Sequence, residues 1–263
     1  MRRLAPVLLV LALTACAQRP EAATPTIGEP VDSMFPRVSQ QALDKWASFP
    51  VDADPRPLVL IGDPVSSVQG FSTDNGKLAF TMGRIDPDGK VPPEAAEAFS
   101  VLTEAKQAAP PEVQPIKVIS AVKGTAAFFT DRGAKQFPAW TFELTESLGP
   151  VAVLAVKPDF TSGHALSNAK VSADGMTLTV PMAKASEPCP GEARITYEAE
   201  SLESATAVAV GLKPVTGEVA PGETGNCAHD LVYRTADYTI RLSKPLGNRV
   251  LVDASGNVLP VSG

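Results

Sequence analysis

Proline constrains this chain more than any other feature of its sequence. It supplies 25 of the 263 residues, about twice the ~5% that is usual in globular proteins. Proline fixes φ and has no backbone N–H, so it interrupts helix interiors and central strands. A helical bundle is therefore nearly excluded, and we expect short helices, many turns and a strand-rich fold. The hydrophobic share of 44% is enough to build a packed core.

Charge and histidine content narrow the classes of partner. The chain has 23 Lys and Arg against 29 Asp and Glu, for a net charge of -6. Proteins that bind nucleic acid usually present an excess of basic residues on one face, so we predict no nucleic-acid partner. The chain has only 2 histidines, which leaves little room for a metal site built from several of them. We predict no metal ion and no cofactor.

The first sixteen residues have the pattern of a bacterial export signal. Met1-Arg2-Arg3 is positively charged, and residues 4–13 are almost wholly apolar but too few to span a membrane, which takes about 20. This arrangement predicts a secretory signal peptide over residues 1–15. Its end, Leu13-Thr14-Ala15-Cys16, resembles the lipobox of bacterial lipoproteins. That resemblance implies cleavage before Cys16 and a diacylglyceryl thioether on its sulfur. The alternative is an ordinary signal peptide that contains a cysteine.

A lipid on Cys16 would anchor the protein to the outer face of the bacterial cytoplasmic membrane. Each buried CH₂ of an acyl chain contributes about 0.8 kcal/mol to such attachment. Residues 16–34 are rich in Pro, Ala, Thr and Glu and lack apolar periodicity. We therefore predict a disordered tether between the anchor and the folded part.

The two remaining cysteines predict a disulfide. With Cys16 assigned to lipid, Cys189 and Cys227 are left, and an even pair in an exported protein favours a bond between them. Two free thiols, a metal-binding pair and a catalytic cysteine are the alternatives.

Patterning in the first half predicts an α+β domain over residues 35–158. Two short helices are expected at residues 39–47, with Trp46 as a core anchor, and at residues 92–107. Asn75-Gly76 lies between apolar runs, which favours a β-hairpin that joins strands at 65–72 and 78–85. The other expected strands are residues 58–61, 116–130 (bent or bulged near Gly124), 136–144 and 151–156.

The second half predicts a β-sandwich-like domain over residues 165–263, after a linker at residues 161–164. Short apolar runs with period-2 alternation and regular turn signals are typical of that architecture. The expected strands are residues 169–172, 176–182, 193–201, 206–213, 238–242, 249–253 and 258–261. The fold class is thus α+β and mostly β, with an N-terminal sheet and two short helices followed by the sandwich.

The sequence contains no recognised catalytic signature. It has no Gly-x-Ser-x-Gly elbow, no His-Glu-x-x-His and no glycine-rich phosphate loop. His164 is isolated and His229 precedes Asp230. A catalytic histidine needs a nucleophile and an orienting carboxylate close to it in space. We interpret both histidines as loop residues and predict no catalytic residue.

The most distinctive segment is FTDRGAKQFPAW at residues 129–140. This Thr-Asp-Arg-Gly turn followed by a Pro-Ala-Trp strand resembles a stretch of uncharacterised actinobacterial surface lipoproteins, and residues 245–253 do likewise. The resemblance implies a surface lipoprotein and no particular activity. Asp131 and Arg132 suit an ion pair or a polar patch, and Trp140 suits a core or a pocket wall. If the chain has a ligand or partner site, we predict it here, because binding residues concentrate on loops held by a rigid sheet.

Three functional hypotheses follow. The leading one is a lipid-anchored envelope lipoprotein with a non-enzymatic binding or interaction role, its partner a protein, a glycan or a lipid. The second is an envelope hydrolase with His229 or Asp131 in its site. The third is a lipid carrier, which requires an apolar pocket within residues 58–156.

Overall fold

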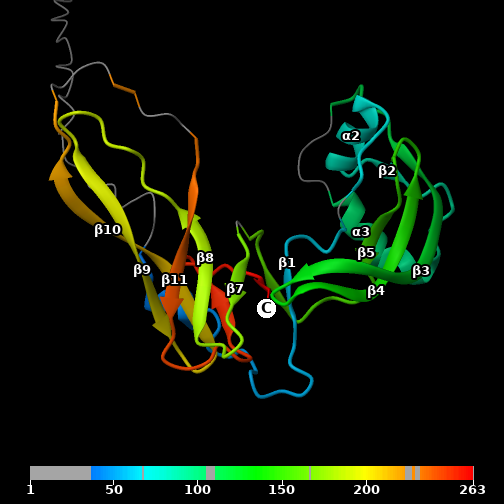
Figure 1. The fold of residues 1–263 in the computed structure, drawn as a ribbon. Helices are drawn as coiled ribbons and strands as arrows, with labels where there is room; N and C mark the ends of the chain where they lie inside the picture. Colours follow the sequence, from blue (N-terminus) through cyan, green and yellow to red (C-terminus); the bar gives the residue numbers. More distant parts are fainter. Residues whose placement is uncertain are drawn as a thin grey trace, which may run out of the picture. The chain divides into compact units, whose positions relative to one another are not determined.

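The computed structural model describes residues 37–66, 68–104, 110–165, 167–222, 227–228 and 232–262 (Figure 1). Its strands form three sheets, and its helices are few and short. The predicted α+β, mostly β class is confirmed. None of the helices in these ranges has the length and hydrophobicity needed to cross a membrane. The predicted signal peptide, Cys16 and the tether lie outside the described residues.

The first sheet has the order β5-β4-β3-β1-β6, with β2 pairing to β3. Its centre is a long hairpin of β3 and β4, which turns at Asp131 and Arg132. Gly133 has a φ of +79° at this turn, a conformation that glycine adopts at little cost. The register shift in the hairpin lies between Val118 and Ser120, not near Gly124 as predicted. The strands are β1 (Val59–Ile61), β2 (Ile85–Asp86), β3 (Ile116–Thr130), β4 (Gly133–Leu144), β5 (Val151–Leu154) and β6 (Phe160–Ser162).

Two further predictions, the linker and the hairpin, were wrong. The linker expected at residues 161–164 is partly strand, because β6 pairs in parallel with β1. The hairpin expected around Asn75-Gly76 is replaced by the helix α2 (Asp74–Thr81). The hydroxyl of Thr73 accepts a hydrogen bond from the Gly76 N–H at 2.9 Å, and such an N-cap stabilises a helix start. The cap and the burial of Ala79 in the core outweigh the local turn preference.

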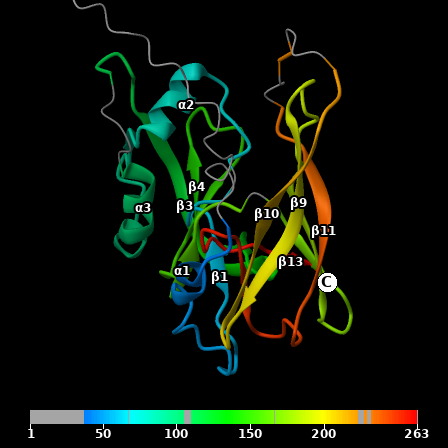
Figure 2. The ribbon, with the colours of Figure 1, turned by 90° about the vertical axis from the view of Figure 1, so that its left-hand side faces the viewer.

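The two predicted helices are confirmed in shortened form. They are α1 (Gln40–Asp44) and α3 (Ala96–Thr103), the latter preceded by a 3₁₀ turn at Pro93–Ala95. Figure 2 shows α2 and α3 on one side of the β3–β4 hairpin. There Ala98 and Leu102 of α3 pack with Trp140 and Phe142 in one core.

The second half consists of two sheets, with orders β12-β10-β9 and β11-β8-β7-β13. Val208 and Val210 of β10 share a core with Leu178 and Val180 of β8, as expected for sandwich-like packing. The strands are β7 (Ala169–Val171), β8 (Thr177–Ala183), β9 (Ala193–Glu203), β10 (Ala207–Val219), β11 (Thr235–Arg241), β12 (Val250–Val252) and β13 (Val261–Ser262).

The other face of β10 is also covered, which explains its unbroken apolar run. Ala207 and Ala209 pack with Trp46, which follows α1, and with Val59 of β1. The Trp46 indole N–H donates to the Gly256 carbonyl at 3.0 Å. Trp46 is thus a core anchor, as predicted, and this core contains residues from both sides of the predicted domain division.

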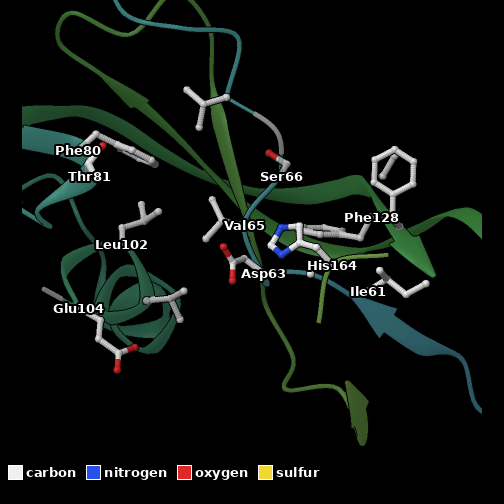
Figure 3. Close-up of a pocket in the computed structure, with 15 residues that line it drawn as sticks. Ile61, Asp63, Val65, Ser66, Phe80, Thr81, Leu102, Glu104, Phe128 and His164 are labelled. Carbon is white, nitrogen blue, oxygen red and sulfur yellow. The ribbon is translucent and has the colours of Figure 1, made fainter. Parts of the chain in front are cut away.

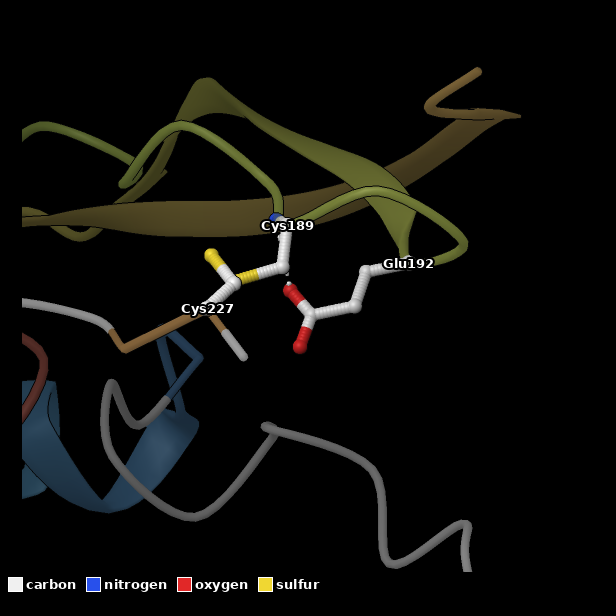
Figure 4. Close-up of a disulfide and its surroundings, with 3 residues drawn as sticks. All are labelled: Cys189, Glu192 and Cys227. Atoms are coloured by element: carbon white, nitrogen blue, oxygen red, sulfur yellow. Dashed lines mark hydrogen bonds between the residues drawn. A yellow bond between two sulfur atoms is a disulfide. The ribbon is translucent and has the colours of Figure 1, made fainter. Parts of the chain in front are cut away.

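The predicted disulfide joins Cys189 to Cys227, whose Cα atoms are 5.8 Å apart (Figure 4). It connects the loop before β9 to the chain between β10 and β11. The carboxylate of Glu192 accepts a hydrogen bond from the Cys189 N–H at 2.9 Å, which fixes the loop on one side of the bond.

Candidate functional site

The turn predicted as a binding loop holds a buried carboxylate. Asp131 is 2% exposed. Its Oδ2 lies 2.5 Å from Nη2 of Arg56 and 3.6 Å from Nε of Arg132. Its Oδ1 accepts a hydrogen bond from the Val59 N–H at 3.0 Å. Both carboxylate oxygens are therefore engaged within the protein.

The two arginines fasten this turn to a distant one. Nη2 of Arg132 donates to the carbonyls of Gly247 and Arg249, at 2.8 and 3.0 Å, and Nε of Arg56 donates to the carbonyl of Asn248 at 2.7 Å. Burial lowers the pKa of Arg132, the charge of Arg56 adds to that effect, and Asp131 opposes it. Asp131, Arg56 and Arg132 thus form a polar junction between the β3–β4 turn and residues 247–249.

Trp140, the third residue predicted for this site, lies elsewhere. It is paired with Lys123 along the β3–β4 hairpin and with Val153 of β5. Its side chain is 6% exposed and belongs to the core beneath α3. Of the two roles predicted for Trp140, core residue or pocket wall, the structure supports the core role. The structure therefore brings Asp131 and Arg132 together and places Trp140 apart from them.

A cavity of about 490 Å³ lies between the chain that follows β1, the helices α2 and α3, and β3 (Figure 3). Small-molecule sites commonly have volumes of roughly 300–1,000 Å³ and mostly apolar walls. The apolar lining residues are Ile61, Val65, Val68, Phe80, Val101, Leu102, Ala127, Phe128 and Phe129. The others are Gly62, Asp63, Ser66, Thr81, Glu104 and His164.

Backbone pairing holds one wall of the cavity to two strands of the first sheet, β3 and β5. Leu60 pairs with Thr130 of β3, and five residues later Val65 bridges to Val153 of β5. The Ser66 N–H donates to the Ala152 carbonyl at 2.8 Å. The segment between β1 and Ser66 is therefore anchored at each end, which gives the cavity a fixed wall.

Gly62 allows a histidine to lie against this wall. Its φ is +87°, and a Cβ added there would come within 3.2 Å of Nε2 of His164. His164 is exposed and in a loop, as predicted, but it is also part of the cavity lining. His229 lies outside the described residues.

Charge in the lining is confined to the rim. Asp63, Glu104 and His164 are exposed, whereas Leu102 and Phe128 in the wall are only 5% and 3% exposed. No lysine or arginine is among the described lining residues. The described lining thus combines an apolar wall with a few exposed polar side chains.

Sequence reasoning did not find these rim residues. Asp63, Glu104 and His164 come from three separated segments, and none carries a motif that marks a site. The only local signal was Gly62 followed by Asp63 and proline, which suggests a tight turn and no ligand.

The residues that the structure describes contain no group of three or more His, Cys, Asp or Glu side chains arranged to hold a metal ion. Comparison with protein-family models, with curated proteins and with solved structures found no match. The cavity and the polar junction must therefore be interpreted from their own geometry.

Proposed function

We propose that this protein is a lipid-anchored envelope lipoprotein that binds a small apolar or amphiphilic ligand without turning it over. The anchor rests on the lipobox-like residues 13–16. The binding role rests on the cavity of about 490 Å³ with its apolar wall. Every lining residue except His164 falls within residues 58–156, the region in which a lipid carrier requires its pocket.

The physical basis of binding is removal of apolar surface from water. Burial contributes roughly 25 cal/mol per Å² of apolar surface, and the partly exposed Val65 and Phe80 and the exposed Phe129 present such surface to the cavity. The hydrolase alternative has less support, because Asp131 uses both of its oxygens in the junction.

A cavity-filling substitution tests the binding role. In Ala127→Trp, an exposed lining residue of β3 is replaced by a large side chain that strands tolerate. Ala134→Trp is the matched control, because Ala134 is an exposed alanine on the neighbouring strand and is not a lining residue. Nile red, which is neutral and apolar, serves as the probe in a fluorescence titration of the full chain in nanodiscs, with empty nanodiscs as background.

We expect Ala127→Trp to weaken Nile red binding at least about tenfold, a free-energy change of about 1.4 kcal/mol, and the control to leave it unchanged. Thermal unfolding of both variants checks that they remain folded. Phe129→Ala gives a second measurement, since this 64% exposed residue contributes to the rim with little burial of its own. Equal affinity of the wild type and all three variants would refute the binding role.

The anchor is tested separately. Mass spectrometry of the exported protein should find residue 16 as the new N-terminus, with a diacylglyceryl group on Cys16. An unmodified Cys16 would refute the anchor and leave the cavity proposal standing.

A further inference from the structure

We propose that two copies of this chain associate side by side through the strands β9 and β11, so that each sheet of the sandwich continues into the same sheet of the other copy. The dimer goes beyond the proposed binding function and does not depend on it, because no residue of β9 or β11 is among the described lining residues of the cavity. The observation behind it is that each strand is complementary to a second, antiparallel copy of itself.

The strands β9 and β11 are edge strands on the same side of the sandwich. In the described part of the chain, β9 pairs only with β10, and β11 pairs only with β8. The two edges contact each other across the sandwich (Figure 2). An edge strand presents unpaired N–H and C=O groups, to which a further strand can be added. A second copy can therefore extend both sheets at the same time.

The exposed residues of β9 fix the register of the first strand pair. Arg194, Thr196 and Glu198 are exposed and alternate along the strand with half-buried residues. When the Thr196 residues of the two copies lie opposite each other, each Arg194 lies opposite a Glu198. The same register sets Ile195 opposite Tyr197 on the inner face. Pairs of opposite charge and pairs of an aromatic with a β-branched residue both stabilise neighbouring strands.

The strand β11 has the same pattern with the order of the charges reversed. Asp237, Thr239 and Arg241 are exposed. When the Thr239 residues of the two copies lie opposite each other, each Asp237 lies opposite an Arg241. Tyr238 then lies opposite Ile240, which is again an aromatic residue beside a β-branched one. Both edges are therefore self-complementary about a central threonine.

The two central threonines lie at the same level of the sandwich. Burial raises the pKa of Tyr238, and the neighbouring Tyr197 raises it further, so these two side chains, one from each strand, are close together. Thr196 and Thr239 are their immediate neighbours in sequence. One two-fold axis can therefore relate both strand pairs, as a closed dimer with identical contacts on the two copies requires.

Other registers of β9 fit a second copy less well. Centring the pair on Tyr197 would place Arg194 opposite Glu200, whose carboxylate already pairs with Arg37 at 2.8 Å. Centring it one residue further on would place two glutamates opposite each other, and like charges in that position are destabilising. Arg194 itself has a 3.6 Å pair with Glu187 in which both side chains are more than half exposed. Such a pair contributes little, so it does not hold Arg194 away from a second partner.

Cysteine substitutions at the axis test the register. Thr196→Cys would place two cysteines opposite each other, with Cα atoms about 4.5–5.5 Å apart, a separation that suits a disulfide. We expect mild oxidation of the full chain in liposomes to give a covalent dimer on a non-reducing gel, and Thr239→Cys to do the same. Leu202→Cys is the matched control, because Leu202 is exposed on the same strand and its two copies would lie about 40 Å apart in this register.

Charge reversal tests the complementarity. Sedimentation equilibrium of the full chain in a density-matched detergent measures the dissociation constant of the dimer. Glu198→Arg would place arginine opposite arginine twice in each dimer, and we expect it to raise that constant at least about tenfold. Adding Arg194→Glu restores opposite charges in exchanged order and should return the constant to within about threefold of the wild type. Glu97→Arg, the same change at an exposed residue of α3, is the matched control and should leave it unchanged.

The outcomes separate a second copy from any other occupant of these edges, with thermal unfolding to check that each variant is folded. A wild-type chain that is monomeric at about 100 μM would overturn the dimer and assign the edges to another segment or another protein. Cross-linking of Thr196→Cys that is no faster than that of Leu202→Cys would overturn it too. A loss of affinity in Glu198→Arg that the second reversal does not restore would refute the register.

Discussion

Replacing Asp131 with asparagine removes a negative charge from a closed site and keeps the shape of the side chain. Asp131 faces Arg56, whose side chain is only 10% exposed, across 2.5 Å. Without the carboxylate, the Arg56 guanidinium stays buried beside Arg132 with no compensating charge. The asparagine oxygen can still accept the Val59 N–H that Oδ1 accepts now.

The expected loss of unfolding free energy is about 3 kcal/mol. Removing one partner of a buried ion pair typically costs about 3–5 kcal/mol, because the other charge is left uncompensated. The backbone hydrogen bond retained by asparagine, with a net value of about 1 kcal/mol, places the estimate at the low end. Asp88→Asn is the matched control, since its pair with Lys117 spans 3.5 Å and both side chains are about half exposed. That substitution should cost at most about 1 kcal/mol.

Urea denaturation followed by circular dichroism, with the disulfide intact, measures both changes by linear extrapolation. Adding Arg56→Met to Asp131→Asn should recover part of the loss, because it removes the stranded charge, and this non-additivity is the signature of a coupled pair. If Asp131→Asn destabilised the protein no more than Asp88→Asn, the junction would not hold the two turns together by its ion pairs.

Three further predictions concern stability. Replacing Cys189 and Cys227 by serine should lower the urea midpoint, at a cost of up to about 4 kcal/mol, because the bond closes a loop of 38 positions; an unchanged midpoint would contradict this. Thr73→Ala should cost about 1 kcal/mol by removing the N-cap of α2, with Thr73→Ser as the control that keeps the hydroxyl. The pKa of Glu203 is lowered from 4.5: burial alone would raise it, but hydrogen bonds from the backbone and Arg249 outweigh burial. Its contribution is therefore present above pH 4.5 and lost as pH falls through the lower folded value. Glu203→Gln should flatten the acid limb of the stability profile, and an unchanged limb would refute that role.

Patterns that depend only on neighbouring residues predicted the strands β3 and β8 well. Period-2 alternation placed β8 within one residue at each end, and the run 116–130 matched β3. The helix α2 was missed because Asn75-Gly76 favours a hairpin turn when only neighbours are considered. The outcome depended on the Thr73 cap and on burial of Ala79 against a core that includes Trp140, which is remote in sequence.

The candidate site was only partly predictable for the same reason. The region in which a lipid carrier would require an apolar pocket, residues 58–156, contains every residue of the described cavity lining except His164. Its rim combines Asp63, Glu104 and His164, and no local pattern relates these positions to one another. Asp131 and Arg132 were singled out by sequence, but their burial depends on the distant residues Arg56 and 247–249.

The abundance of proline by itself determined that helices would be short and that strands and turns would dominate, because proline acts on its own backbone and its immediate neighbour. The pairing of Cys189 with Cys227 was predicted by assigning Cys16 to lipid, which left an even pair of cysteines. Only the tertiary structure decided that the turn at Asp131 and Arg132 is a polar junction and that the chain after β1 lines a cavity. Burial, charge pairing and enclosed volume are set by residues that meet only after the chain has folded.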